Sequence, residues 1–244
     1  MSAIQYDVTD GVATIALAAP ERRNALTPET ALELAAAVDR ADADTGVGAI
    51  VVTGGPAFCA GADLSTLGGV ESDPVADANV TAIESIYSAF VRLGEAKAPS
   101  IAAVRGAAVG AGLNLALATD VRIVARDARL LSGFGRIGLH PGGGHFALVT
   151  RLAGPQVAAA LGIFGAEVNG ERAVELGLAW AAEADADVEP AALALARRVA
   201  TDPPLARAMH ASLRQESGPP GVPWHVAVEV ERARQLWSLR RRAG

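Results

Sequence analysis

Two glycine-rich turns, each set between a strand-like run and an apolar run, most constrain how this chain can fold. The first turn, residues 58–64 (FCAGADL), follows the β-branched run 49–52, and the second, residues 108–114 (AVGAGLN), follows the run 101–104. Small residues at such a junction let a ligand approach the backbone, and a helix start presents unpaired N–H groups with partial positive charge. One such turn can receive an anion or a carbonyl oxygen. Two facing turns would form an oxyanion hole.

Alternating strand and helix patterns predict an α/β fold. Asp10-Gly11 separates two alternating runs, which is typical of a β-hairpin, and Thr27 followed by Pro28 predicts a helix start. Residues 65–78 are rich in Gly, Ser, Asp and Pro and predict a mobile loop. We expect strands at 4–8, 13–17, 49–53, 101–105 and 121–125, and helices at 28–39, 79–93 and 113–118. Repeated strand-turn-helix units favour parallel stacking over a sandwich.

Composition is consistent with one large domain and restricts its ligands. Of the 244 residues, 51% are hydrophobic but only 4% are aromatic, so the core must consist mainly of Ala, Val, Leu and Ile. No Pro/Ser-rich linker divides the first 190 residues. The net charge of −6 argues against a sequence-independent nucleic-acid binder, which needs a basic face. A small anionic ligand stays compatible, because local arginines and helix N-termini can hold phosphates.

Several other kinds of site are excluded. Cys59 is the only cysteine, so neither a disulfide framework nor a CxxC site can form, and we expect it to pack beside the ligand rather than react. A dinucleotide fingerprint would need glycine where Leu115 stands, and the lone Lys97 is not in a P-loop context. No metal is expected, because the histidines lack a ligand spacing; they are His140, His145, His210 and His225.

We expect a cytoplasmic protein with no membrane segment. The N-terminus shows neither a basic patch nor a long apolar run, so no signal peptide is visible. The longest weakly polar stretch, 101–119, is interrupted by Arg105 and Asn114. It cannot provide the roughly 20 apolar residues of a membrane span.

Five segments in a fixed order resemble a known family. They are 20–26 (PERRNAL), the turn 58–64, the stretch 99–120, the segment 137–144 (IGLHPGGG) and the stretch 169–180. This series resembles the crotonase, or enoyl-CoA hydratase/isomerase, superfamily. The resemblance implies a spiral of ββα units over residues 1–189, which carries the coenzyme A site and the oxyanion hole. It also implies a C-terminal helical region, 190–244, that assembles a homotrimer or a hexamer of two trimers.

The resemblance assigns the oxyanion donors and the coenzyme A contacts. The donors are the backbone N–H groups of Ala62 and Ala111; alanine in place of glycine preserves a backbone donor where φ is negative. Coenzyme A is implied as part of the substrate, with no tightly bound cofactor. Its expected contacts are Ala60, Asp63 and Leu64 near the adenine, Ala25 and Leu26 along the pantetheine, and Arg23 or Arg22 at a phosphate. Guanidinium groups pair well with phosphate, although a solvated arginine pair is the alternative.

The C-terminus departs from the family. A lysine-containing segment that reaches the coenzyme is usual there, whereas this chain ends in residues 239–244 (LRRRAG). These arginines either substitute for that lysine or form a solvated terminus.

The three usual acid positions of the family hold other residues here. Hydratases of the family use two glutamates, and the matching positions are Asn114 and, counted back from Pro141, Phe134. A further acid of some isomerases follows that proline, where this chain has Gly142. None of these three residues exchanges a proton near neutral pH. We therefore expect two-glutamate hydration to be absent.

Other residues are candidates for proton transfer. His140 and His145 flank the closing glycine turn, and an imidazole pKa of about 6.5 suits acid–base work. The alternative is that His140 packs under the turn, while His145 caps the next helix or faces solvent. Glu84 and Tyr87 also lie in a helix expected near the site, with surface or packing roles as their alternatives.

Three classes of function follow. The chain is an enzyme that acts on an acyl-CoA thioester through an enolate-like intermediate, a non-catalytic acyl-CoA-binding protein, or a structural partner in mixed oligomers. The two turns favour the first two classes, because a purely structural partner needs no oxyanion hole.

Overall fold

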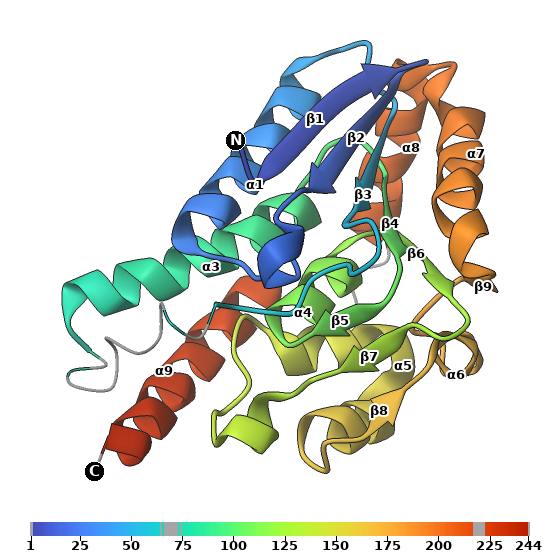
Figure 1. Ribbon diagram of the computed structural model, residues 1–244. Helices are drawn as coiled ribbons and strands as arrows, with labels where there is room; N and C mark the ends of the chain where they lie inside the picture. The colour runs from blue at the N-terminus through green and yellow to red at the C-terminus, as the bar shows by residue number, and fades with distance from the viewer. Residues whose placement is uncertain (1, 64, 66–72, 74, 217–222, 244) are drawn as a thin grey trace.

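Figure 1 shows the computed structural model of the chain. It describes residues 2–63, 65, 73, 75–216 and 223–243. The expected adenine contact Leu64, and most of the expected loop at 65–78, lie outside the described residues.

The strands form two sheets. The six-stranded sheet has the order β1-β2-β3-β4-β6-β9, and the three-stranded sheet has the order β5-β7-β8. The strands are β1 (Ile4–Thr9), β2 (Val12–Leu17), β3 (Ala49–Thr53), β4 (Ser100–Val104), β5 (Ala107–Val109), β6 (Val121–Ala125), β7 (Arg129–Leu131), β8 (Glu167–Val168) and β9 (Ala181–Glu183).

Parallel pairing dominates, as the sequence predicts. From β2 to β9 every neighbouring pair of the large sheet is parallel, and only the β1–β2 hairpin is antiparallel. Residues of β3 and β4 are buried throughout, and α7 packs against both strands. The expected hairpin and parallel stacking are confirmed.

The helices cover the sheets and continue to the C-terminus. They are α1 (Pro28–Ala43), α3 (Asp77–Gly94), α4 (Ala111–Ala118), α5 (His145–Gly162), α6 (Gly170–Glu175), α7 (Val188–Ala200), α8 (Pro203–Glu216) and α9 (Trp224–Ala243), with 3-10 turns at Pro20–Arg22, Phe134–Ile137 and Asp185–Asp187. Figure 1 shows α1 and α3 on one side of the large sheet and α7 on the other. Among the described residues, no helix combines the length and apolar character that crossing a bilayer requires.

Local signals set where α1 starts. The Thr27 side chain accepts a hydrogen bond from the N–H of Thr30 at 3.2 Å, and Pro28 occupies the first turn. The helix continues four residues beyond the expected end at Asp39. Two carbonyl groups in its last turn, those of Ala41 and Asp42, accept hydrogen bonds from Arg207 of α8, which stabilises the extra turn.

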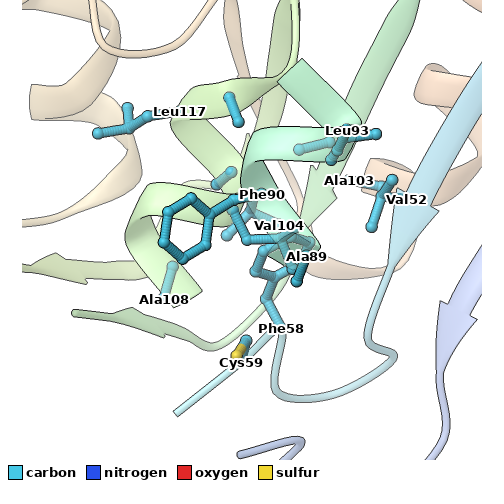
Figure 2. Packing of buried hydrophobic residues seen from close by; sticks show 14 of the residues in the cluster. Val52, Phe58, Cys59, Ala89, Phe90, Leu93, Ala103, Val104, Ala108 and Leu117 are labelled. Atoms are coloured by element: carbon cyan, nitrogen blue, oxygen red, sulfur yellow. The ribbon is translucent and has the colours of Figure 1, made fainter. Parts of the chain in front are cut away.

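The core is aliphatic, as the composition predicts. Figure 2 shows Phe58 and Phe90 among Ala, Val and Leu side chains, with Cys59 beside Ala108. Burial raises the pKa of the Cys59 thiol to about 12. Cys59 is therefore a buried, unreactive packing residue.

Candidate functional site

Strand pairing brings the two glycine-rich turns into direct contact. Cys59 pairs in parallel with Ala108. Its N–H donates to the carbonyl oxygen of Ala107, and its own carbonyl oxygen accepts from the N–H of Val109, both at 3.0 Å. The chain leading into the first turn thus lies against β5, which leads into the second turn.

Glycine is required where the turns touch. A Cβ atom on Gly112 would lie 2.7 Å from the Cβ of Cys59, and one on Gly61 would lie 2.8 Å from the carbonyl oxygen of Val109. Gly61 also has a φ of +104°, which side-chain-bearing residues rarely adopt. The close approach of the two turns depends on both glycines.

Two backbone N–H groups on these turns, those of Ala62 and Ala111, have no hydrogen-bond partner within the described part of the chain. Both residues line the same cavity, and neither has a positive φ, so an N–H donor is preserved at each. Ala111 is the first residue of α4, where the helix leaves its N–H groups free and partly positive. Alanine can therefore stand in place of glycine at both expected donor positions, since neither position needs a positive φ.

The cavity beside these donors is mainly apolar. It holds about 780 Å³ of empty space, including the part open to solvent. Its aliphatic and aromatic walls include Ile83, Ile86, Phe90 and Phe134. The side chains of Tyr87, Asn114, Ser132 and Gln235 are polar, and none of the described lining residues carries a carboxylate.

Buried Asn24 fastens the segment before α1 to the first turn. Its Nδ2 donates to the carbonyl oxygens of Gly54 and Ala57 at 2.8 and 2.7 Å, and its Oδ1 accepts from the N–H of Ala19 at 2.9 Å. Sequence reasoning gave Asn24 no role. The asparagine itself was the available signal, because asparagine tolerates the positive φ found here.

The expected coenzyme A residues lie along this segment. Arg23 is exposed, and its carbonyl oxygen accepts from the N–H of Ala60 at 3.0 Å, so its side chain starts beside the first turn. Half-buried Arg22 instead donates to the Thr30 hydroxyl at 2.9 Å. Ala25 is also half-buried. Arg23 is thus the freer of the two arginines.

Leu26 and Asp63 hold the first turn in place. The N–H of Leu26 donates to the carbonyl oxygen of Gly61 at 2.7 Å, and its carbonyl oxygen accepts from the N–H of Asp63 at 2.9 Å. The Leu26 side chain is fully buried. Hydrogen bonds from Ser65 lower the pKa of the partly exposed Asp63.

Asn114, His145 and Ser132 form a hydrogen-bonded chain at the cavity. Asn114 Nδ2 donates to the carbonyl oxygen of Gly142 at 3.0 Å, which directs its Oδ1 to His145 Nδ1 at 2.9 Å. We therefore assign the ring proton to Nδ1, and Nε2 accepts from the Ser132 hydroxyl at 2.6 Å. Burial lowers the pKa of His145 to about 4, so the ring is neutral at neutral pH.

This arrangement corrects one expectation about His145. The side chain neither faces solvent nor caps a helix, because it is fully buried between α4 and the end of β7. Ser132 was missed entirely. Its local Ser-Gly sequence reads as a loop, and the partner histidine follows only 13 residues later.

The last helix holds His145 from the other side. The buried Glu231 carboxylate of α9 accepts hydrogen bonds from the backbone N–H groups of His145 and Phe146 at 2.9 and 3.1 Å. A carboxylate at the start of α5 satisfies free N–H groups and interacts favourably with the helix dipole.

The other expected proton carriers lie elsewhere. Half-buried His140 donates from Nδ1 to the carbonyl oxygen of Pro141 at 2.7 Å, and its ring meets Phe146 edge-on. Exposed Glu84 pairs with Arg232. Neither His140 nor Glu84 is among the cavity-lining residues.

Tyr87, in contrast, occupies the cavity beside the third acid position. It is buried and hydrogen-bonded to Gln235, and burial raises the pKa of its phenol. A Cβ atom on Gly142 would lie 2.6 Å from Gln235 Cδ and still closer to the Tyr87 hydroxyl. The space for a side chain at residue 142 is therefore already filled.

Phe134, at the expected position of the second glutamate, lines the cavity and packs edge-on against His145, with ring centroids 5.4 Å apart. The ring makes this wall apolar. Over the residues that the structure describes, no group of three His, Cys, Asp or Glu side chains is arranged to hold a metal ion.

Comparison with known proteins gives a consistent picture. Residues 7–223 match the family model described as enoyl-CoA hydratase/isomerase. The chain is 46% identical over 222 residues to the Mycobacterium tuberculosis protein named "Probable enoyl-CoA hydratase echA14", covering 88% of this chain and 84% of that protein. It is 36% identical to the Escherichia coli 1,2-epoxyphenylacetyl-CoA isomerase, over 83% of this chain and 78% of the other.

A solved structure gives the same result for the fold. The crystal structure of an enoyl-CoA hydratase from Polaromonas sp. JS666 superposes with a TM-score of 0.82 at 28% identity, covering 94% of this chain and 90% of that one. The mixed α/β fold and the C-terminal helices agree with the crotonase fold expected from the sequence. The chain belongs to the enoyl-CoA hydratase/isomerase family, within the crotonase superfamily.

Proposed function

We propose that the chain is an acyl-CoA-processing enzyme that holds the thioester carbonyl oxygen between the N–H groups of Ala62 and Ala111. The observation that carries this proposal is that two unpartnered N–H groups on touching turns line one apolar cavity. Such donors stabilise the negative charge of an enolate-like intermediate. Loss of one donor typically raises the barrier by about 2.7–4 kcal/mol.

The surroundings support a thioester of coenzyme A. Exposed Arg23 starts beside the first turn, where a phosphate can reach it without desolvating the guanidinium. The aliphatic and aromatic wall formed by Ile83, Ile86 and Phe90 provides an apolar environment for the acyl group.

The reaction is proposed to differ from two-glutamate hydration. Asn114 donates and accepts fixed hydrogen bonds, Phe134 is apolar, and the space at Gly142 is filled. The named relatives include an isomerase as well as proteins named as hydratases. Their names therefore do not select one reaction for this chain.

The second candidate is a non-catalytic acyl-CoA-binding protein. The lack of a carboxylate among the described lining residues favours it, because such a pocket can bind a thioester without moving protons.

Self-association is a further part of the proposal. Leu205, Met209 and Leu213 repeat every four residues along α8 and are 52%, 52% and 56% exposed. This apolar stripe supports a trimer or a hexamer. Light scattering of the purified chain measures that state directly.

Calorimetry tests the binding site. Butyryl-CoA should bind more tightly than free butyrate, and Arg23→Ala should weaken binding. Exposed Arg172, which pairs with Glu175 on α6, offers a control, since Arg172→Ala should leave affinity unchanged. If no acyl-CoA binds over a range of chain lengths, the proposal is wrong. Binding without turnover of any thioester would favour the second candidate.

A further inference from the structure

We propose that Ser132, His145 and Asn114 are a catalytic relay that hydrolyses the acyl-CoA thioester, with the Ser132 hydroxyl as nucleophile. The inference rests on the proposed function, because it uses the same acyl-CoA site and the same Ala62 and Ala111 donors.

The three side chains have the geometry of an activated nucleophile. Ser132 Oγ lies 2.6 Å from His145 Nε2, and His145 Nδ1 lies 2.9 Å from Asn114 Oδ1. A hydroxyl becomes nucleophilic when an adjacent base accepts its proton and a third group orients that base. The bond from Asn114 Nδ2 to the Gly142 carbonyl fixes the amide, so only the Nδ1–H tautomer of His145 satisfies both neighbours.

The relay lies next to the oxyanion donors. Ser132 directly follows Leu131, whose carbonyl oxygen accepts from the N–H of Gly110 at 3.1 Å, and Gly110 is the residue before donor Ala111. Asn114 follows Ala111 by one helical turn of α4. Ser132 and Asn114 both line the cavity, as do Ala62 and Ala111, so the relay and the donors border one space.

The protonation state of the base is suitable. Burial lowers the pKa of His145 to about 4, which leaves Nε2 unprotonated at neutral pH. Phe134 packs edge-on against the ring and covers one side of the imidazole. From α9, the charged Glu231 carboxylate lies close to His145 and accepts a hydrogen bond from its backbone N–H.

The reaction proceeds in two steps, formation of a seryl ester and hydrolysis of that ester. Ser132 Oγ attacks the thioester carbon while its proton moves to His145 Nε2, and the oxygen takes up negative charge between Ala62 and Ala111. The C–S bond then breaks, the leaving thiolate takes the proton from Nε2, and a seryl ester is formed. Water next attacks the ester carbon and gives a proton to Nε2, and that proton returns to Ser132 Oγ as the carboxylic acid leaves.

A purely structural role for the Ser132–His145–Asn114 relay predicts a different effect of removing the Ser132 hydroxyl. Asn114 and His145 already satisfy each other, so a packing role requires no hydroxyl facing the cavity. In that case Ser132→Ala would change stability without removing any turnover. The relay predicts the opposite.

The test uses saturated acyl-CoA substrates, which have no double bond to hydrate. Acetyl-, butyryl-, octanoyl- and phenylacetyl-CoA are incubated with the purified chain, and released thiol and intact protein mass are followed. We expect thiol release and a transient mass increase of one acyl group on Ser132. Ser132→Ala should lower the release rate about 100-fold or more and abolish the adduct, and His145→Gln should do the same.

Ser100→Ala is the matched control, because Ser100 is equally buried but bonds to Asp120, away from the cavity. It should keep the wild-type rate. Calorimetry on folded Ser132→Ala separates the two proposals. If the wild type and this variant bind acyl-CoA but the wild type releases no thiol, or the variant releases it equally fast, the relay is wrong and the binding site stands. If the wild type binds no acyl-CoA, the proposed function fails, and the relay fails with it.

Discussion

Gly61 lies so close to Val109 that a Cβ atom on the glycine would come within 2.8 Å of the valine carbonyl oxygen. This contact joins the two turns that carry the unpartnered N–H groups of Ala62 and Ala111. It also makes the alignment of these groups sensitive to a single methyl group.

Gly61→Ala should therefore weaken acyl-CoA binding at least tenfold, because the backbone of one turn must shift and the Ala62 N–H shifts with it. Gly55→Ala is the matched control: Gly55 also has a positive φ, +62°, but nothing lies within 4 Å of its Cβ position. Both variants should lose about 1 kcal/mol from backbone strain. Equal affinities for the two variants in calorimetry would contradict the role of this contact.

Stability should fall in mildly acidic solution because of His145. Its pKa is about 4 in the folded protein, against about 6.5 in an unfolded chain. Between these values the unfolded chain binds more protons, so stability that is complete above about pH 6.5 is lost as the pH falls toward 4. From about pH 7.5 to about pH 5 the loss from this group is about 2 kcal/mol.

Urea unfolding at the two pH values measures this effect. His145→Gln should remove about that much of the pH dependence, whereas replacement of exposed His225 by Gln should leave it intact. A His145→Gln variant with the wild-type pH dependence would show that the ring is not buried in its neutral form.

Hydration of crotonyl-CoA should be absent from the wild type and should need two substitutions to appear. Each positioned acid or base contributes about 10²–10⁴-fold, and hydration needs two. Asn114→Glu or Phe134→Glu alone should give little, and the double variant should exceed the product of the single gains. Loss of the enoyl thioester absorbance reports the rate. Fast hydration by the wild type would mean that another proton carrier acts.

An aspartate at position 142 should destabilise the protein rather than add an acid. Its Cβ would meet the Tyr87 hydroxyl and the Gln235 amide, which already fill that space. Overpacking of this kind typically costs about 1–3 kcal/mol. Gly135→Asp is the control, since nothing lies within 4 Å of its Cβ position. Thermal unfolding of both variants measures the difference in stability. Removal of the hydroxyl by Tyr87→Phe should restore part of the stability that the aspartate at position 142 costs.

Much of the fold could be predicted because its signals are local. The Asp10-Gly11 hairpin, the Thr27 cap and the strand before each turn depend on neighbouring residues, and all are present. The helix α1 ends later than the sequence predicts, because Arg207 stabilises its last turn. This arginine lies at least 160 residues further along the chain, so no local pattern reveals the contact.

The candidate site was only partly predictable for the same reason. Backbone donors follow from glycine patterns within each turn. The bond between Ser132 and His145, and the filling of the space at Gly142 by Gln235, depend on packing between α4, α5 and α9. No residue pattern within one segment encodes such a meeting.

Glu231 makes the docking of α9 and the placement of His145 a single event, since one buried carboxylate holds the N–H groups that begin α5. Thermodynamic linkage is reciprocal. If docking of α9 raises the affinity of the cavity for a ligand, the bound ligand stabilises the docked α9 by the same factor. The amide protons of the last helix would then exchange with solvent more slowly when the cavity is occupied, so that the far end of the chain reports what the first turns have bound.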